Sequence, residues 1–170
     1  MGIVDPVKAL RILDKYAVTR LSHKWPSCRL GADVDILVHD APLSATLLAD
    51  YLRASVDHTS IQMVRAGTHS HVDVIADGLL HLRFDLIDKI PWPFAVDSRL
   101  IHEAVDSAIT QYGIQTPSTP YECVLRELEW QANGHISPHK HEHHRWSQAH
   151  WEVEAQAIWD RCCPTLHRDA

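Results

Sequence analysis

Two acidic residues, Asp33 and Asp35, stand in a segment whose composition is typical of a β-strand, residues 33–38. Because side chains alternate along a strand, both carboxylates share one face, with their Cα atoms about 6–7 Å apart. Such a pair can converge on one divalent cation, or hold two cations about 3.5–4 Å apart, as phosphoryl-transfer sites do. Without a metal ion the two charges would repel each other. The alternative is a strand at the end of a sheet whose acidic residues only face solvent.

Histidine is the second residue type with chemical potential, because five of the 14 histidines fall within ten residues. These five are His135, His139, His141, His143 and His144. On a helix, His139 and His143 would lie one turn apart and could chelate a transition metal. The metalloprotease motif H-E-x-x-H is absent, as are the P-loop, the Rossmann glycine pattern and the nucleophile elbow. A solvated, polar helix start is therefore the favoured interpretation, and a metal-handling protein is a third hypothesis for the chain.

Hydrophobic periodicity and turn residues predict alternating helices and strands, followed by a helical last third. Strands are expected at 16–21, 33–38, 60–65, 71–76 and 79–87, with an extended segment at 114–118. Helices are expected at 5–16, 42–55, 97–112, 119–132 and 139–162, and Thr119 with Glu122 forms a capping-box pattern. The expected fold is α/β (α+β), a mixed sheet with flanking helices. Residues 1–116 are expected to form the main domain, and 117–170 a helical segment packed on it.

The acidic strand belongs to a wider set of segments with a common pattern. Gly31 to Val38 has the pattern G-A-D-x-D-hydrophobic, which is similar to a G-S-D-x-D-hydrophobic strand, and Leu80 to Asp88 contains a hydrophobic-R-F-D-L strand. An opening Y-x-hydrophobic-x-R begins at Tyr16, and a helical signature follows at Pro117–Ser118, Tyr121–Glu122, Leu125–Trp130 and Lys140–His143. Over about residues 15–145 the chain resembles the polymerase-β-type nucleotidyltransferase superfamily, in the branch found in bacterial surface-polysaccharide gene clusters.

This resemblance implies a nucleotidyltransferase-type mixed sheet and a metal-dependent reaction. Asp33 and Asp35 would hold Mg²⁺, or Mn²⁺, on the phosphates of an NTP. A third carboxylate on a neighbouring strand, Asp73 or Asp85, would complete the catalytic and metal-binding set and could act as general base. The nucleotidyl group would pass to a small acceptor, such as a sugar or a polysaccharide precursor.

The choice between Asp73 and Asp85 depends on the hairpin that Asp77-Gly78 predicts between their strands. An ideal two-residue turn would pair Asp73 with Leu82 and place the two acidic residues on opposite faces of the sheet. The polar neighbours of Asp85 favour that residue, whereas the order of elements favours Asp73. A β-bulge would reconcile the two, and the choice stays open at this point.

The resemblance is incomplete at the loop after the first strand. The superfamily has Gly-Ser there, whereas residues 20–24 contain no glycine, so a close backbone approach to phosphate is harder. Six residues are candidates to bind the nucleotide instead: Arg20, Ser22, Lys24, Arg83, Lys140 and His143. Of these, Arg83 could equally pair with a nearby acidic residue. The missing glycine favours an alternative function, a catalytically degenerate binding or regulatory module that acts with a partner protein.

Composition limits the partners and the compartment. Sixteen Lys and Arg against 22 Asp and Glu give a net charge of −6, which argues against nucleic-acid binding through a broad basic face. No apolar run is long enough for a membrane span, and the N-terminus lacks the layout of a signal peptide. The four cysteines form no metal-binding or C-x-x-C pattern and are expected to be reduced thiols. A cytoplasmic protein is the expectation.

Overall fold

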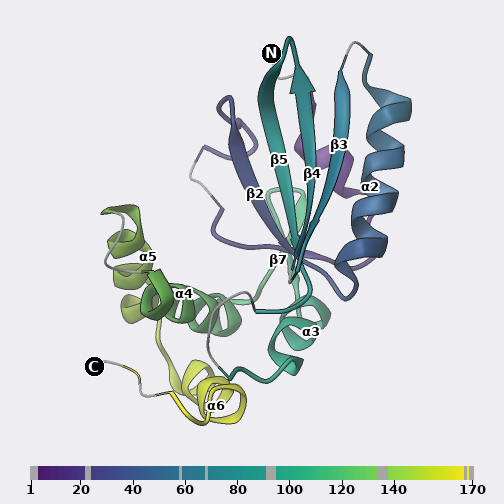
Figure 1. Cartoon of the computed structure of the whole chain (residues 1–170). Helices are drawn as coiled ribbons and strands as arrows, with labels where there is room; N and C mark the ends of the chain where they lie inside the picture. The colour runs from purple at the N-terminus through teal and green to yellow at the C-terminus, as the bar shows by residue number, and fades with distance from the viewer. Residues whose placement is uncertain are drawn as a thin grey trace.

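The computed structural model describes residues 4–21, 24–57, 59–67, 69–90, 95–133, 138–166 and 168, without the side chains of 66 and 138–140. The main sheet has five strands, β1 (Ala17–Val18), β2 (Ala32–Leu37), β3 (Ser60–Ala66), β4 (His69–Ala76) and β5 (Leu79–Ile87). Their order is β1-β2-β5-β4-β3, and β2 and β5 are parallel while every other neighbouring pair is antiparallel. The mixed sheet and the helical C-terminal segment confirm the predicted α+β class (Figure 1).

One face of the sheet is closed by the first two helices, α1 (Pro6–Leu10) and α2 (Ala41–Ser55). The strands supply alternate apolar residues to this core, including Val34, Ile36, Val72, Phe84 and Leu86, all buried. Asp40 precedes helix α2 as its N-cap, and its carboxylate accepts a hydrogen bond from the backbone N–H of Leu43. Because strand side chains alternate, burying this set turns the residues between them to the opposite face.

The opposite face is covered at one end only, by helices α3 (Arg99–Asp106), α4 (Thr119–Asn133) and α6 (Val153–Cys162). They form a second core with Ala17, Leu37 and Ile87, the last side chains that the sheet presents on this face (Figure 1). Helix α5 (Pro138–Ala149) packs against α4. Asp35 and Asp33 precede Leu37 by two and four positions, and Asp85 and Arg83 precede Ile87 in the same way. These polar residues therefore lie beyond the edge of the helical segment.

The hairpin between β4 and β5 differs from an ideal one. Ala76 pairs with Leu79 and Ile75 with Leu80, as the Asp77-Gly78 turn predicts, and both turn residues have the positive φ of a tight hairpin (51° and 75°). The register then shifts, so that Val74 pairs with Leu82. This β-bulge places one extra residue on β5, and the expected pairing of Asp73 with Leu82 is wrong: Asp73 pairs with Arg83.

Three helix predictions are also corrected. The first helix ends at Leu10 rather than residue 16, and the helix expected over 97–112 ends at Asp106. After it, β6 (Ile109–Gln111) and β7 (Ile114–Thr116) form a hairpin around Tyr112-Gly113, both at positive φ. The glycine is thus a turn residue rather than a helix end. The long helix expected over 139–162 is two helices, because residues 150–152 leave the helical path and let α6 fold back onto α4.

The burial of side chains along β5 predicts which truncations lower the free energy of unfolding most. Phe84→Ala removes a fully buried ring from the β5 core and should lower the free energy of unfolding by about 3–5 kcal/mol. Leu79→Ala, on the same strand at a position 56% exposed, should cost less than about 1 kcal/mol. Urea denaturation of both variants measures the difference, and equal losses would contradict the assigned faces of β5.

Candidate active site

The acidic residues predicted to do chemistry share one face of the sheet. In the parallel pair β2–β5, Asp35 pairs with Asp85 and Asp33 with Arg83. In the antiparallel pair β4–β5, Asp73 pairs with Arg83. Cross-strand partners lie on the same face, so the expectation that Asp73 and Asp85 face opposite ways is wrong. The bulge between Val74 and Ile75 is the reason, since it shifts β5 by one residue relative to β4.

Asp73 is held in a two-point ion pair. Its Oδ1 accepts a hydrogen bond from Nε of Arg83 at 2.7 Å, and its Oδ2 accepts one from a terminal nitrogen of the same guanidinium at 2.8 Å. Asp73 is buried, and the hydrogen bond from Arg83 raises the pKa of that guanidinium further. Both carboxylate oxygens are therefore engaged, and Arg83 pairs with an acidic residue, which is one of the two roles considered for it.

Asp85 differs, because one of its oxygens has no close donor. Among the described residues, Oδ1 of Asp85 is buried and has no hydrogen-bond partner, and Nε2 of His71 lies 3.8 Å away. Its neighbour across the strands, Asp35, is half-buried. Burial raises the pKa of Asp35, Arg20 opposes the rise, and the negative charge of Asp85 adds to it. Two adjacent carboxylates with an unmet acceptor make a place that favours a cation.

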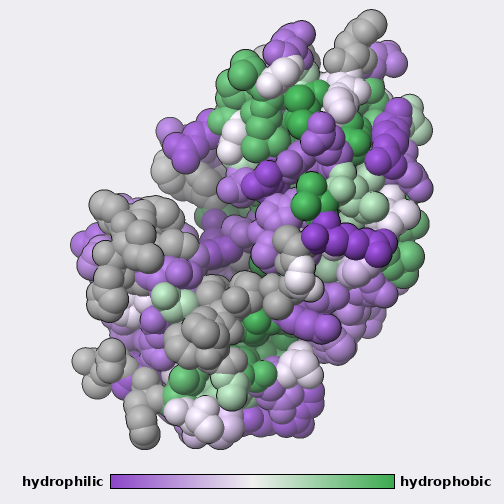
Figure 2. Space-filling model, viewed as in Figure 1, coloured by the Kyte–Doolittle hydropathy of each residue, from purple (hydrophilic) through white to green (hydrophobic). Residues whose placement is uncertain are grey.

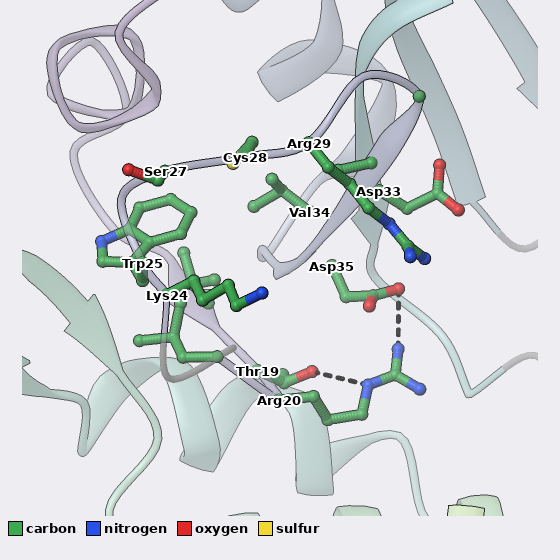
Figure 3. Close-up of a pocket in the computed structure, with 14 residues that line it drawn as sticks. Thr19, Arg20, Lys24, Trp25, Ser27, Cys28, Arg29, Asp33, Val34 and Asp35 are labelled. Atoms are coloured by element: carbon green, nitrogen blue, oxygen red, sulfur yellow. Dashed lines mark hydrogen bonds and ion pairs between the residues drawn. The ribbon is translucent and has the colours of Figure 1, made fainter. Parts of the chain in front are cut away.

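Arg20 supplies positive charge to this acidic pair from the end of β1. Its guanidinium lies 2.6 Å from Oδ1 of Asp35 and also pairs with Glu129 of α4. Its backbone N–H donates to Glu122 of α4 at 2.9 Å, and its Nε donates to Thr19 (Figure 3). Arg20 therefore connects the sheet to the helical segment.

The charge of Arg20 is retained in spite of its burial. Burial works against the charged form, but the nearby carboxylates, with Asp35 first, outweigh it and raise the pKa of the guanidinium. The backbone of Arg20 is left-handed, with φ of 55°, a conformation that glycine adopts easily and that costs other residues about 1–2 kcal/mol.

A cavity of about 470 Å³ lies between the loop after β1 and the start of β2. Among the residues that line it, Lys24 and Arg29 bring positive charge, and Asp33 and Asp35 bring negative charge; these side chains point into one shared space (Figure 3). Trp25 also lines the cavity, and its indole N–H is buried without a hydrogen-bond acceptor in the described part of the chain. The volume falls within the range of small-molecule and cofactor sites, about 300–1,000 Å³.

A second, smaller cavity of about 110 Å³ lies on the other side of Asp35. It is bordered by Asp85, His69 and Arg20, and by Leu125 of α4. Figure 2 shows hydrophilic residues gathered along the hollow between the sheet and the helical segment. Asp35 and Arg20 line both cavities, so the acidic pair lies between a large space and a small one, an arrangement that suits two reactants.

The remaining predicted residues divide into two groups. Ser22 lies outside the described residues, as does the side chain of Lys140. His143 of α5 lies 3.2 Å from Glu129, so it touches the carboxylate that pairs with Arg20 rather than the cavity. Its neighbour His144 lies 3.0 Å from buried Glu127. These two histidines join α5 to α4, which gives part of the histidine cluster a packing role.

Several site residues were not anticipated from the sequence. His69 and His71 border Asp85, and Glu129 neutralises Arg20 from a helix far along the chain. The two histidines had a usable signal, since residues two apart on a strand share a face. Glu122 matched a capping box, but its carboxylate instead accepts hydrogen bonds from the backbone of Arg20 and from Arg126.

No protein-family model matches the chain, and neither a curated protein nor a solved structure matches it significantly. Within the described residues no helix is both long enough and apolar enough to cross a membrane. A functional assignment therefore has to be argued from the side chains on the polar face of the sheet.

Removing the charge of Arg20 should be costly for stability. Arg20→Ala leaves the carboxylates of Asp35 and Glu129 buried without their shared partner, which should lower the free energy of unfolding by about 3–5 kcal/mol. Arg53→Ala breaks a solvent-exposed ion pair with Asp50 on α2 and should cost about 0–1 kcal/mol. Chemical denaturation followed by circular dichroism compares the two variants. A decrease in the free energy of unfolding of less than about 1 kcal/mol for Arg20→Ala would show that the ion pairs of Arg20 contribute little to stability.

Proposed function

We propose that this protein is a metal-dependent nucleotidyltransferase, which moves a nucleotidyl group from an NTP to a small acceptor. The observation that carries the proposal is the pairing of Asp35 with Asp85 across parallel strands, with Asp33 on the same face, beside a cavity that contains Lys24 and Arg29. Carboxylates on adjacent strands next to a basic, ligand-sized cavity are what phosphoryl transfer requires.

The donor set fits Mg²⁺ or Mn²⁺. All the ligands are carboxylate oxygens, which hard divalent cations prefer, and Oδ1 of Asp85 is buried and makes no hydrogen bond within the described chain. Asp33, Asp35 and Asp85 would hold the ion, while Asp73 stays in its ion pair with Arg83. When bound, the ion supplies charge neutralisation and polarisation of the phosphoryl oxygens.

The larger cavity would hold the nucleotide. Lys24 and Arg29 would offset phosphate charge that the carboxylates would otherwise repel, which is the usual task of lysine and arginine at phosphates. Trp25, which lines this cavity, offers an aromatic face to the base or the ribose. Ser22 and Lys140, by the superfamily resemblance, remain candidates for further phosphate contacts.

The smaller cavity would hold the acceptor hydroxyl beside Asp85. In the transfer step the acceptor oxygen forms a bond to the α-phosphorus, and the bond from that phosphorus to pyrophosphate breaks. Asp85, which borders this cavity, would accept the hydroxyl proton, as a general base does. A cavity of about 110 Å³ would admit only the hydroxyl-bearing end of a small acceptor, such as a sugar or polysaccharide precursor.

The composition supports a proposal for the class of acceptor and for the cellular compartment of the reaction. A net charge of −6 argues against a nucleic-acid acceptor. NTPs are available in the cytoplasm, where free thiols also persist, and the four cysteines are all unpaired. We therefore place the reaction in the cytoplasm.

A second candidate function is a non-catalytic, nucleotide-binding or regulatory module that acts with a partner protein. The ion pair at 2.6 Å between Arg20 and Asp35 favours it, because that pair already neutralises one of the three carboxylates. The two candidates differ in turnover. Pyrophosphate release in the presence of NTP, metal and small hydroxyl acceptors supports the enzyme, whereas nucleotide binding without release supports the module.

A thermal-shift panel tests the nucleotide site. NTP with Mg²⁺ or Mn²⁺, at 100 times the dissociation constant, should add about 2.7 kcal/mol of stability to the wild type, beyond metal alone. Asp35→Asn should lose this shift because it removes a carboxylate at the centre of the site. Asp50→Asn, on the exposed side of α2, is the control and should keep the shift. An unchanged shift in Asp35→Asn would remove the proposal.

Cys28 reports on the larger cavity. It lines that cavity and is exposed, whereas Cys123, Cys162 and Cys163 are buried, and burial raises the pKa of Cys123 to about 11 and of Cys163 to about 12. A thiol reagent should therefore label one cysteine in the native protein and four after denaturation. Saturating NTP with metal should slow the native labelling about tenfold or more. A nucleotide that stabilises the fold without protecting Cys28 would place its binding elsewhere.

A further inference from the structure

His69, His71 and Asp85 form a compact set of metal-ligating side chains that the proposed reaction does not use as a unit. His69 and His71 are two residues apart on β4, so they share one face. Asp85 of the neighbouring strand β5 pairs with His71. One ligand atom from each residue can be chosen so that all three lie within 4.8 Å of one another. All three residues are half-buried, which limits competition from water.

Two atoms of this set lack the partners that buried polar atoms normally have. Within the described chain, Nδ1 of His71 and Oδ1 of Asp85 are buried and make no hydrogen bond. The 3.8 Å between Nε2 of His71 and Oδ1 of Asp85 is too long for a hydrogen bond. The rings of His69 and His71 meet edge to face, with centroids 4.5 Å apart. A purely structural ion pair would be closer and better satisfied.

The electrostatic setting also favours a cation. Asp35 lies next to Asp85 across the parallel strands, and the negative charge of Asp85 helps to raise the pKa of Asp35. A divalent ion beside Asp85 would relieve this repulsion on the side away from Arg20. Neutral imidazoles can supply the other ligands without adding charge.

We infer that His69, His71 and Asp85 bind a divalent transition metal, with Zn²⁺ and Co²⁺ as the class, in a two-histidine, one-carboxylate site. Imidazole nitrogen suits these ions and not Mg²⁺, which prefers oxygen ligands. Ligand atoms around such an ion, at about 2.1 Å from it, lie roughly 3.4 Å apart, so rotation of the side chains closes the set without moving the strands. Three protein ligands leave positions open for water or a hydroxyl group.

This inference goes beyond the proposed reaction and does not rest on it. Asp85 belongs to both sites, but the histidines lie on β4, beyond the carboxylates of β2. A transition metal held here would border the smaller cavity, which His69 and Asp85 both line. The site can therefore be measured with metal alone, in the absence of any nucleotide.

Cobalt titration of the full-length, metal-free protein without a polyhistidine tag tests the site. The d–d absorption of Co²⁺ should report one equivalent bound in the wild type. His71→Ala and Asp85→Asn should each weaken that binding by tenfold or more, and His69→Ala should do the same. Circular dichroism of each metal-free variant verifies the fold, and His69→Gln and His71→Gln serve as milder replacements if an alanine variant does not fold.

Two matched controls distinguish this site from other histidines. His39 and His102 lie with ring centroids 4.8 Å apart, and His39 is 3.3 Å from Asp106, but Lys15 already pairs with that carboxylate at 2.6 Å. Their double alanine variant should retain the cobalt spectrum. His139→Ala combined with His141→Ala should retain it as well, although weaker additional binding can disappear.

The outcomes separate this inference from the proposed function. Asp33→Asn should abolish the shift given by Mg²⁺ with NTP and keep the cobalt spectrum, whereas His69→Ala should do the reverse. Cobalt binding that survives loss of both His69 and His71 would overturn the inference. So would cobalt binding that disappears only in the variants of His39 and His102 or of His139 and His141.

Discussion

The buried charge of Arg20 is the constraint on which the site depends. In addition to the second apolar core, it joins the end of β1 to the acidic strand β2 and to helix α4, by way of Asp35 and two glutamates. Its left-handed backbone is unfavourable for a residue with a side chain, so the ion pairs must offset that cost. The same contacts that attach the helical segment to the sheet therefore also fix the position of Asp35.

The sheet adds a second constraint through its register. The parallel register of β2 and β5 puts Asp85 on the face that carries Asp33 and Asp35, and a single bulge between β4 and β5 brings Asp73 and the two histidines of β4 to that same face. The acidic residues on that face differ in whether a positive charge neutralises them. Asp73 is neutralised by Arg83, whereas Asp85 keeps an unsatisfied oxygen beside Asp35. Buried like charges oppose folding, so their concentration at one place points to a function rather than to stability.

Much of the framework could be predicted from local sequence. Alternating apolar residues located β2 to β5 within two residues, and Asp77-Gly78 located the hairpin. The shared face of Asp33 and Asp35 also followed from strand geometry alone. These features depend on short-range periodicity and turn preference, which neighbouring residues determine.

The remainder depends on contacts between distant segments. The bulge leaves no mark in the local pattern, yet it decides which acidic residues can meet. The pairing of Arg20 with Glu129 joins residues 109 positions apart, so Arg20 was expected at phosphate rather than in an ion pair. Likewise, Tyr112-Gly113 was interpreted as a helix end, because a glycine alone does not distinguish a helix C-terminus from a hairpin turn.

The central claim is that Asp85, and not Asp73, completes a metal–nucleotide site with Asp33 and Asp35. Electron paramagnetic resonance of Mn²⁺, titrated with a non-hydrolysable NTP analogue, tests it on Asp85→Asn and Asp73→Asn. The ion-paired role of Asp73 predicts that Asp73→Asn still binds the Mn²⁺–nucleotide complex while Asp85→Asn does not. Binding that is lost in Asp73→Asn and kept in Asp85→Asn, or kept in both, would contradict the claim.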